Sequence, residues 1–124
     1  LHGKCIAVIE DNPAIVEAYR QTLVHKGAHV VVLSEDEREL EAQIETIDSI
    51  DCILSDYRLR QTTGDVLIQK LRDSYNSEIP AIIVTADTSP SHINLFADLN
   101  VQVLHKPITF HAITQAIEKM VNGK

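Results

Sequence analysis

The stretch Cys52-Ile-Leu-Ser-Asp56 indicates the fold, because a continuous apolar run ends there in a carboxylate. Four further short runs are rich in β-branched and apolar residues, and they lie at 5–9, 29–33, 81–85 and 101–105. Strands that are covered on both faces, as in a parallel sheet, have such unbroken apolar runs. The run at 101–105 alternates more between polar and apolar residues, which is typical of an edge strand.

Helical patterns follow each of these runs. The first begins after Asn12, a good N-cap, with Pro13 at the first helical position, where a missing N–H costs nothing. Its apolar stripe consists of Ile15, Val16, Tyr19 and Leu23. The expected inward positions of the other helices are Leu40, Ile44 and Ile47 in 36–47; Val66, Leu67, Ile68 and Leu71 after Gly64; Ile93, Phe96 and Ala97 after Ser89-Pro90; and Ile113, Ala116, Ile117, Met120 and Val121 after the N-cap Thr109. Strand and helix thus alternate five times, and right-handed crossovers predict one parallel sheet with helices on both faces, an α/β fold.

Length and composition limit the class of protein. The chain has 124 residues, which predicts a single domain spanning 1–124. The formal net charge of -7 repels phosphate backbones, so direct binding to nucleic acid is not expected. No apolar run approaches the roughly 20 residues that cross a bilayer, so direct membrane contact is not expected either. Because the chain begins with the polar Leu1-His-Gly-Lys4 and not with Met, we expect a piece of a longer protein or a lost start, without a signal peptide.

The two cysteines, Cys5 and Cys52, lie inside apolar runs and form no C-x-x-C pair. We expect both near the amino-terminal ends of adjacent strands, as free thiols of a cytoplasmic protein. The six histidines are scattered and are expected as surface or helix residues, not as metal ligands; they are His2, His25, His29, His92, His105 and His111.

Polar and charged side chains stand where the predicted strands end. They are Glu10-Asp11, Asp56, Thr85 and Lys106. In a parallel sheet these ends meet at one edge, where ligands bind. Three carboxylates repel one another unless a cation neutralises them, and an all-oxygen ligand set favours a hard ion such as Mg²⁺. A carboxylate nucleophile, a metal, an ammonium group and a hydroxyl together make a site for an acyl phosphate.

Each of these residues also has an ordinary structural explanation. Acidic residues stabilise helix N-termini, and a threonine that ends a strand is often only a β-branched strand former. The complete set, each member at or just after a strand end, favours a functional site over unrelated caps.

The sequence resembles the receiver domain of two-component response regulators over essentially its whole length. The residues that carry the resemblance are Glu10-Asp11, Asp56 in Ile53-Leu-Ser-Asp-Tyr57, Gly64, Thr85-Ala86 and Lys106-Pro107. The resemblance implies a doubly wound, flavodoxin-like fold with a five-stranded parallel sheet in the order 2-1-3-4-5. It also implies a signalling phosphoacceptor, with self-phosphorylation and autodephosphorylation as its only reactions, and not an enzyme.

The resemblance also implies roles for single residues. Asp56 is expected to accept a phosphoryl group from a phosphohistidine, with Lys106 and the Thr85 hydroxyl beside it, and the bond between Lys106 and Pro107 is expected to be cis. The expected cofactor is Mg²⁺, and its expected ligands are Asp11, Asp56, the backbone carbonyl of Arg58, and Glu10 through water. The expected partner is a histidine kinase or a histidine phosphotransfer domain, and the receiver is expected to be a monomer or weak dimer.

Two segments depart from the family pattern. The loop Leu59-Arg-Gln-Thr-Thr-Gly64 keeps only the leucine and the glycine, and Val103 stands where the family usually has an aromatic residue. A rotation of Thr85 coupled to that aromatic is therefore not expected. Asp56-Tyr-Arg-Leu59 and Leu104-His-Lys-Pro-Ile108 resemble the C-terminal receivers of hybrid sensor histidine kinases. A stand-alone relay protein and the front half of a DNA-binding regulator are the other contexts.

Two other functions stay open at this point. A flavodoxin-like electron carrier would share the fold, but the acidic Glu10-Asp-Asn-Pro13 would repel the phosphate of FMN. A phosphate-independent docking module is the second, although the complete set of site residues argues against it.

Two details of the same edge also have alternative explanations. Ala14 and Ala18 either allow a partner helix to approach the first helix or are simply good helix formers. Arg58 and Asp87 have opposite charges on neighbouring loops. They pair and cover the site, or Arg58 turns inward to the phosphoryl oxygens, or the two side chains stay solvated and never meet.

Overall fold

The computed structural model describes residues 1–87 and 89–122, without the side chains of residues 90, 91 and 93. Strands and helices alternate in the order β1 (Cys5–Ile9), α1 (Pro13–His25), β2 (His29–Val32), α2 (Glu37–Thr46), β3 (Cys52–Asp56), α3 (Gly64–Tyr75), β4 (Ala81–Thr85), α4 (Pro90–Leu99), β5 (Gln102–His105) and α5 (Phe110–Val121). The strands form one parallel sheet in the order β2-β1-β3-β4-β5, which confirms the predicted fold and places β5 at an edge.

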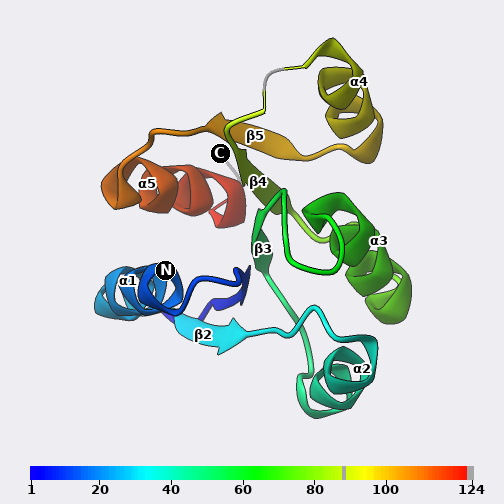
Figure 1. Cartoon of the computed structure of the whole chain (residues 1–124). Helices are drawn as coiled ribbons and strands as arrows, with labels where there is room; N and C mark the ends of the chain where they lie inside the picture. Colours follow the sequence, from blue (N-terminus) through cyan, green and yellow to red (C-terminus); the bar gives the residue numbers. More distant parts are fainter. Residues whose placement is uncertain (88, 123–124) are drawn as a thin grey trace.

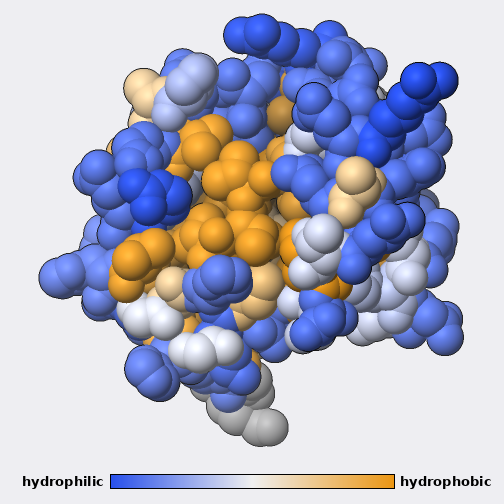
Figure 2. Space-filling model, turned by 90° about the horizontal axis from the view of Figure 1, so that it is seen from below, coloured by the Kyte–Doolittle hydropathy of each residue, from blue (hydrophilic) through white to orange (hydrophobic). Residues whose placement is uncertain are grey.

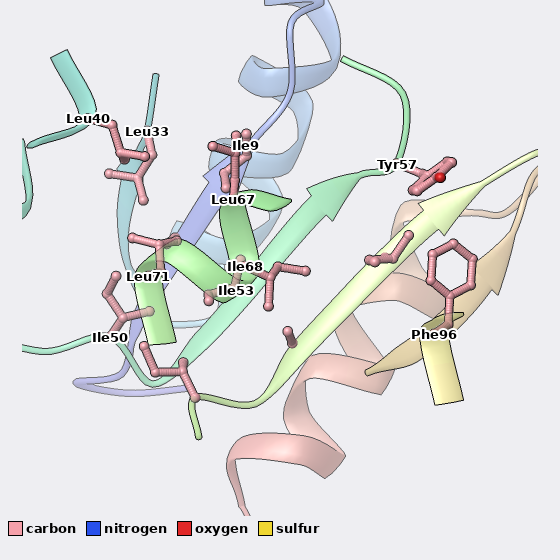
Figure 3. Close-up of a cluster of buried hydrophobic side chains, with 14 residues drawn as sticks. Ile9, Leu33, Leu40, Ile50, Ile53, Tyr57, Leu67, Ile68, Leu71 and Phe96 are labelled. Atoms are coloured by element: carbon pink, nitrogen blue, oxygen red, sulfur yellow. The ribbon is translucent and has the colours of Figure 1, made fainter. Parts of the chain in front are cut away.

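The helices cover both faces of this sheet (Figure 1), with α1 and α5 on one face and α2, α3 and α4 on the other. Successive strand residues point to opposite faces, which divides the core into two clusters. Ile53, labelled in Figure 3, and Ile83 belong to the cluster that includes residues of α3 and α4, whereas Leu54 and Ile82 belong to the cluster that includes residues of α1 and α5. Both faces of the central strands are therefore buried, as their unbroken apolar runs predicted.

Side-chain N-caps hold the starts of three helices, and two of them, Asn12 and Thr109, were predicted. The side chain of Asn12 accepts from the N–H of Ala14, Asp36 accepts from Glu39, and Thr109 accepts from Ala112. Each cap satisfies an N–H that has no partner inside the helix. Since each of these helices follows a strand after a short loop, the caps also fix where that loop ends.

Two predicted inward positions were wrong. Val66 is 53% exposed, because α3 buries the side that carries Leu67, Ile68 and Leu71. Ala97 is also exposed, while its neighbour Phe96 is buried in the core. In both cases an apolar residue lies next to the buried stripe in sequence but not on the same helix face. The predicted position Ile93 lies outside the described side chains.

The second edge of the sheet is β2, and its outer side carries apolar surface. Figure 2 views the molecule from below and shows this surface, and Val32 of β2 and Val24 of α1 are among the exposed apolar residues. The side chain of Gln43 covers main-chain groups at the end of β2, since its Nε2 donates to the carbonyl of Val32 over 3.0 Å and its Oε1 accepts from Ser34 N over 2.8 Å. Such capping hinders the pairing of another strand with this edge.

The thiols of Cys5 and Cys52 are both free, as predicted. Cys52 pairs with Ile6 across β1 and β3, so the two cysteines are near neighbours in the sheet. Cys5 packs on the cluster beneath α2 and α3, whereas Cys52 belongs to the cluster beneath α1 and α5. The side chains therefore lie on opposite faces of the sheet and cannot form a disulfide.

Among the described helices, none is long and apolar enough to span a membrane.

Candidate functional site: an acidic cluster at the carboxyl ends of the strands

Three carboxylates meet where β1 and β3 end. Ile9 is in register with Ser55, so the residues that follow, Glu10 and Asp56, come out side by side. One oxygen from each of Glu10, Asp11 and Asp56 lies within 4.8 Å of the others, and all three side chains are partly buried. The sheet thus brings together the three acidic residues that the sequence singled out.

The crowding of these groups perturbs Glu10 most. Burial is the first cause, followed by a hydrogen bond with the Asp11 side chain and the charge of Asp56, and together they raise the pKa of Glu10 to about 7. The main-chain N–H groups of Asp11 and Asn12 donate to the Glu10 carboxylate over 2.8 and 3.1 Å, which opposes that rise. A carboxyl that is difficult to ionise among its neighbours is typical of a site built to hold a cation.

Lys106 supplies a positive charge from the far side of the cluster. Its Nζ lies 3.0 Å from Oδ1 of Asp56, and its main-chain N–H donates to the carbonyl of Thr85 over 2.9 Å. The bond between Lys106 and Pro107 is cis, as the resemblance implied. The ammonium group therefore points across β4 to the end of β3.

Thr85 ends β4 and is buried, one residue beyond the partner of Asp56 in the sheet. Its Oγ1 accepts from the main-chain N–H of Asp87 over 2.9 Å. The structure places the predicted hydroxyl in the same edge of the sheet as the carboxylates, on the strand next to Asp56.

Gly64 is required by the main chain of Asp56. A Cβ on Gly64 would lie 2.4 Å from the carbonyl oxygen of Asp56 and 2.6 Å from Oγ of Ser55, and no side chain fits in that space. The N–H of Gly64 donates to the carbonyl of Tyr57 over 2.7 Å. The close approach of α3 to the end of β3 explains why a glycine at this position accompanies the carboxylate.

Of the three arrangements considered for Arg58 and Asp87, the structure has the ion pair. Nη2 of Arg58 lies 2.8 Å from Oδ2 of Asp87. The pKa of Asp87 is held well below its usual range, first by the side chain and N–H of Ser89 and then by Arg58 and His92. The pair joins the loop after β3 to the loop after β4 beside Thr85.

The aromatic neighbours of this pair were not predicted. His92 was expected only as a surface or helix residue, but its Nδ1 lies 2.8 Å from Oδ2 of Asp87, and its ring lies 4.9 Å from that of Tyr57. Phe96 meets Tyr57 edge to face at 5.1 Å. The helical spacing of His92 and Phe96 is the only signal in the sequence, and it cannot tell which ring they meet.

Two charged residues around Asp11 were also missed. Nε of Arg60 lies 3.7 Å from Oδ2 of Asp11, and the carboxylate of Glu35 accepts from the N–H groups of Arg60 and Gln61. Loop residues with long side chains show no periodicity that would have predicted these contacts.

Both explanations for Ala14 and Ala18 of α1, a face where a partner helix docks and a simple helix-forming preference, are compatible with the structure. Ala14 is exposed and Ala18 is partly buried. Beside them Tyr19 meets the ring of Phe110 of α5 edge to face at 5.3 Å, and Phe110 itself is 40% exposed. The surface next to the acidic cluster is therefore partly apolar.

The likeness to known structures agrees with this geometry. The chemotaxis protein CheY4 of Vibrio cholerae has a TM-score of 0.79 and 22% identity, covering 94% of this chain and 98% of that chain. A two-component response regulator from Clostridium difficile has a TM-score of 0.82 and 16% identity, covering 97% of each chain. The receiver domain of the hybrid histidine kinase CckA has a TM-score of 0.73 and 21% identity, covering 94% of this chain and 98% of that chain. At such identities the likeness shows the fold alone.

A search of curated proteins found no match. The family model described as response regulator receiver domain matches residues 6–118, which include every residue of the acidic cluster, Thr85 and Lys106. The chain therefore belongs to the receiver domain family of two-component response regulators, whose members are signalling phosphoacceptors.

Proposed function

We propose that Asp56 accepts a phosphoryl group from a phosphohistidine, with Mg²⁺ as cofactor, in a two-component phosphorelay. One observation carries the proposal: the carboxylates of Glu10, Asp11 and Asp56 gather within 4.8 Å, and Lys106 pairs with Asp56 over 3.0 Å. Asp56 has the position of a nucleophile, because it ends the central strand β3 and is the carboxylate that Lys106 contacts.

The donor set fits Mg²⁺, since it consists of carboxylate oxygens with room for water and phosphate oxygens. Asp11 and Asp56 would bind the ion directly and Glu10 through water, while the backbone carbonyl of Arg58 is the proposed third protein ligand. Bound Mg²⁺ would neutralise the carboxylates and the charge of the phosphoryl oxygens.

The proposed transfer exchanges one bond to phosphorus for another. An oxygen of the Asp56 carboxylate forms the new P–O bond while the P–N bond of the phosphohistidine breaks, and the imidazole nitrogen keeps the electron pair and takes a proton from water. Lys106 can then pair with a phosphoryl oxygen, and the Thr85 hydroxyl can donate to another. Thr85 ends β4 and Lys106 directly follows β5, the two strands that lie beyond β3 in the sheet.

The donor that we propose is a histidine kinase or a histidine phosphotransfer domain in the cytoplasm, and the receiver domain that we propose spans 1–124. The family membership favours this function over a flavodoxin-like electron carrier. A receiver of a hybrid kinase, a stand-alone relay protein and the front of a DNA-binding regulator are all compatible with it.

Labelling with radioactive acetyl phosphate tests the proposal without a partner protein. We expect the wild type to take up label in Mg²⁺ and to lose that ability in excess chelator. Asp56→Asn should take up none, because it removes the nucleophile while keeping the shape of the side chain. Asp98→Asn, which makes the same change on the exposed side of α4, should label like the wild type.

Label on Asp56→Asn, or labelling that chelator leaves unchanged, would contradict the proposed site. A wild type that binds its partner but takes up no label from any phosphodonor would favour the phosphate-independent docking module.

A further inference from the structure

In addition to Lys106, a second cation, Arg60, lies against the acidic cluster. Nε of Arg60 lies 3.7 Å from Oδ2 of Asp11, and its side chain is 73% exposed. Lys106 pairs with Asp56 on the other side of the cluster. Each of the two carboxylates proposed as direct Mg²⁺ ligands therefore has its own positive partner.

The main chain beneath Arg60 is held in place by a different part of the molecule. Glu35 lies between β2 and α2, and its carboxylate accepts from the N–H of Gln61 over 2.6 Å and from the N–H of Arg60 over 3.1 Å. The loop also closes on itself, because Leu59 N donates to the carbonyl of Thr62 over 3.1 Å. The backbone at Arg60 is thus tied down at several points, while the exposed side chain can still move.

Electrostatics makes the Arg60 contact conditional on the state of the cluster. The positive charge of the Arg60 guanidinium group lowers the repulsion among the three carboxylates. A divalent cation on Asp11 would do the same with twice the charge and would repel the guanidinium. The two cations cannot both keep their full attraction to Asp11.

We propose that Arg60 is a resident counter-ion of the metal site, which pairs with Asp11 in the metal-free protein, yields it to Mg²⁺ and so lowers the affinity for that ion. Glu35 is the positioning residue that holds the loop so that Arg60 reaches Asp11. This inference rests on the proposed function, because it takes the acidic cluster to be the Mg²⁺ site.

The test is the dissociation constant for Mg²⁺, measured by isothermal titration calorimetry on the unphosphorylated protein. We expect Arg60→Gln to bind Mg²⁺ more tightly by up to about fivefold, the range that an exposed ion pair can supply. The matched control is Lys26→Gln, which removes one positive charge beyond the end of α1, at the opposite end of the sheet. It should change the constant by less than about 1.5-fold, because salt screens charges over such distances.

Glu35→Gln separates the proposed competition from a general charge effect. The loss of a nearby negative charge should by itself weaken Mg²⁺ binding, whereas release of the loop frees Asp11 from Arg60 and should tighten it. We expect tighter binding by about twofold, within the same range. The tightening should disappear when Glu35→Gln is made in the Arg60→Gln protein.

The outcomes distinguish this inference from the proposed function. A wild type that binds no Mg²⁺ would overturn the proposed function and the inference with it. A wild type that binds Mg²⁺, with Arg60→Gln no tighter than Lys26→Gln, would overturn the inference alone. Weaker binding by Glu35→Gln would overturn the positioning role of Glu35.

Discussion

Two regions at opposite ends of the sheet contain buried or partly buried charged groups, and the two regions compensate these charges in different ways. At the amino-terminal end, Arg72 of α3 is only 4% exposed. Its guanidinium donates to the main-chain carbonyls of Ile79, Leu99 and Asn100, of which the last two lie at the carboxyl end of α4. The charge is surrounded by fixed acceptors, and the negative end of a helix dipole adds to their attraction.

At the carboxyl-terminal end of the strands, the charges are only partly compensated. One oxygen from each of Glu10, Asp11 and Asp56 lies within 4.8 Å of the others, while the side chains of their cations Lys106 and Arg60 are 41% and 73% exposed. The pKa of Glu10 is raised, first by its burial and then by its neighbours Asp11 and Asp56. One region therefore uses a buried charge to join three segments of the fold, and the other keeps unfavourable charge where a ligand can neutralise it.

The largest expected effect is a loss of stability when Arg72 of the first region is replaced. Replacement of Arg72 by methionine should lower the free energy of unfolding by about 3 kcal/mol, because the buried carbonyls lose a charged donor. Urea denaturation measures this loss. Arg20→Met is the matched control, since Arg20 forms an exposed ion pair with Glu17 on α1 and should cost less than about 0.5 kcal/mol. Equal losses in the two variants would show that the buried contacts of Arg72 do not stabilise the fold.

In the second region, a substitution of Glu10 is expected to raise the free energy of unfolding, by less than the substitution of Arg72 lowers it. The pKa of Glu10 is raised from 4.5 to about 7, so the folded protein holds a proton that the unfolded chain has released between these pH values. Stability should therefore fall as pH rises through this window in the absence of metal. Glu10→Gln should remove that fall and be more stable near neutral pH by about 1 kcal/mol, a value reduced for solvent screening.

Urea denaturation in the presence of chelator measures the free energy of unfolding of the wild type and of Glu10→Gln. The measurements cover pH 4 to 8, about the span of that window. Glu45→Gln removes an exposed carboxylate in the last turn of α2 and should keep the pH dependence of the wild type. A Glu10→Gln protein with the same pH dependence as the wild type would mean that Glu10 is not the group responsible.

The smallest expected effect concerns the ion pair between Arg58 and Asp87, which joins the loops after β3 and β4 and contributes little to stability because Arg58 is exposed. We expect it to hinder water from reaching phosphorylated Asp56. Arg58→Ala and Asp87→Ala should both speed the decay of the phosphoryl label in Mg²⁺ by more than about twofold, roughly 0.4 kcal/mol in the barrier. Arg38→Ala on α2 is the control and should decay like the wild type.

If only Arg58→Ala shortens the life of the label, Arg58 acts on the phosphoryl group directly and the ion pair does not matter. If neither variant decays faster, the pair does not control the access of water.

Local signals were sufficient for most of the fold. The N-caps and the apolar strands depend on neighbours in the chain or on the uniform geometry of strands and helices. The same geometry placed Glu10, Asp11 and Asp56 together, because parallel strands end at the same edge. Adjacent apolar residues such as Val66 were misassigned, since one step along a helix turns a side chain by about 100°.

By itself the sequence determined the order of strands and helices along the chain, the burial of both faces of the sheet and the presence of carboxylates at the strand ends. Only the tertiary structure decided which charged side chains meet across the chain: Arg58 reaches Asp87, 29 residues away, and Glu35 holds the N–H of Arg60, 25 residues away. Backbone periodicity sets where strand residues point, because each has few allowed conformations. Long arginine and glutamate side chains have many rotamers, and their partners are chosen by the loops that the folded sheet brings together.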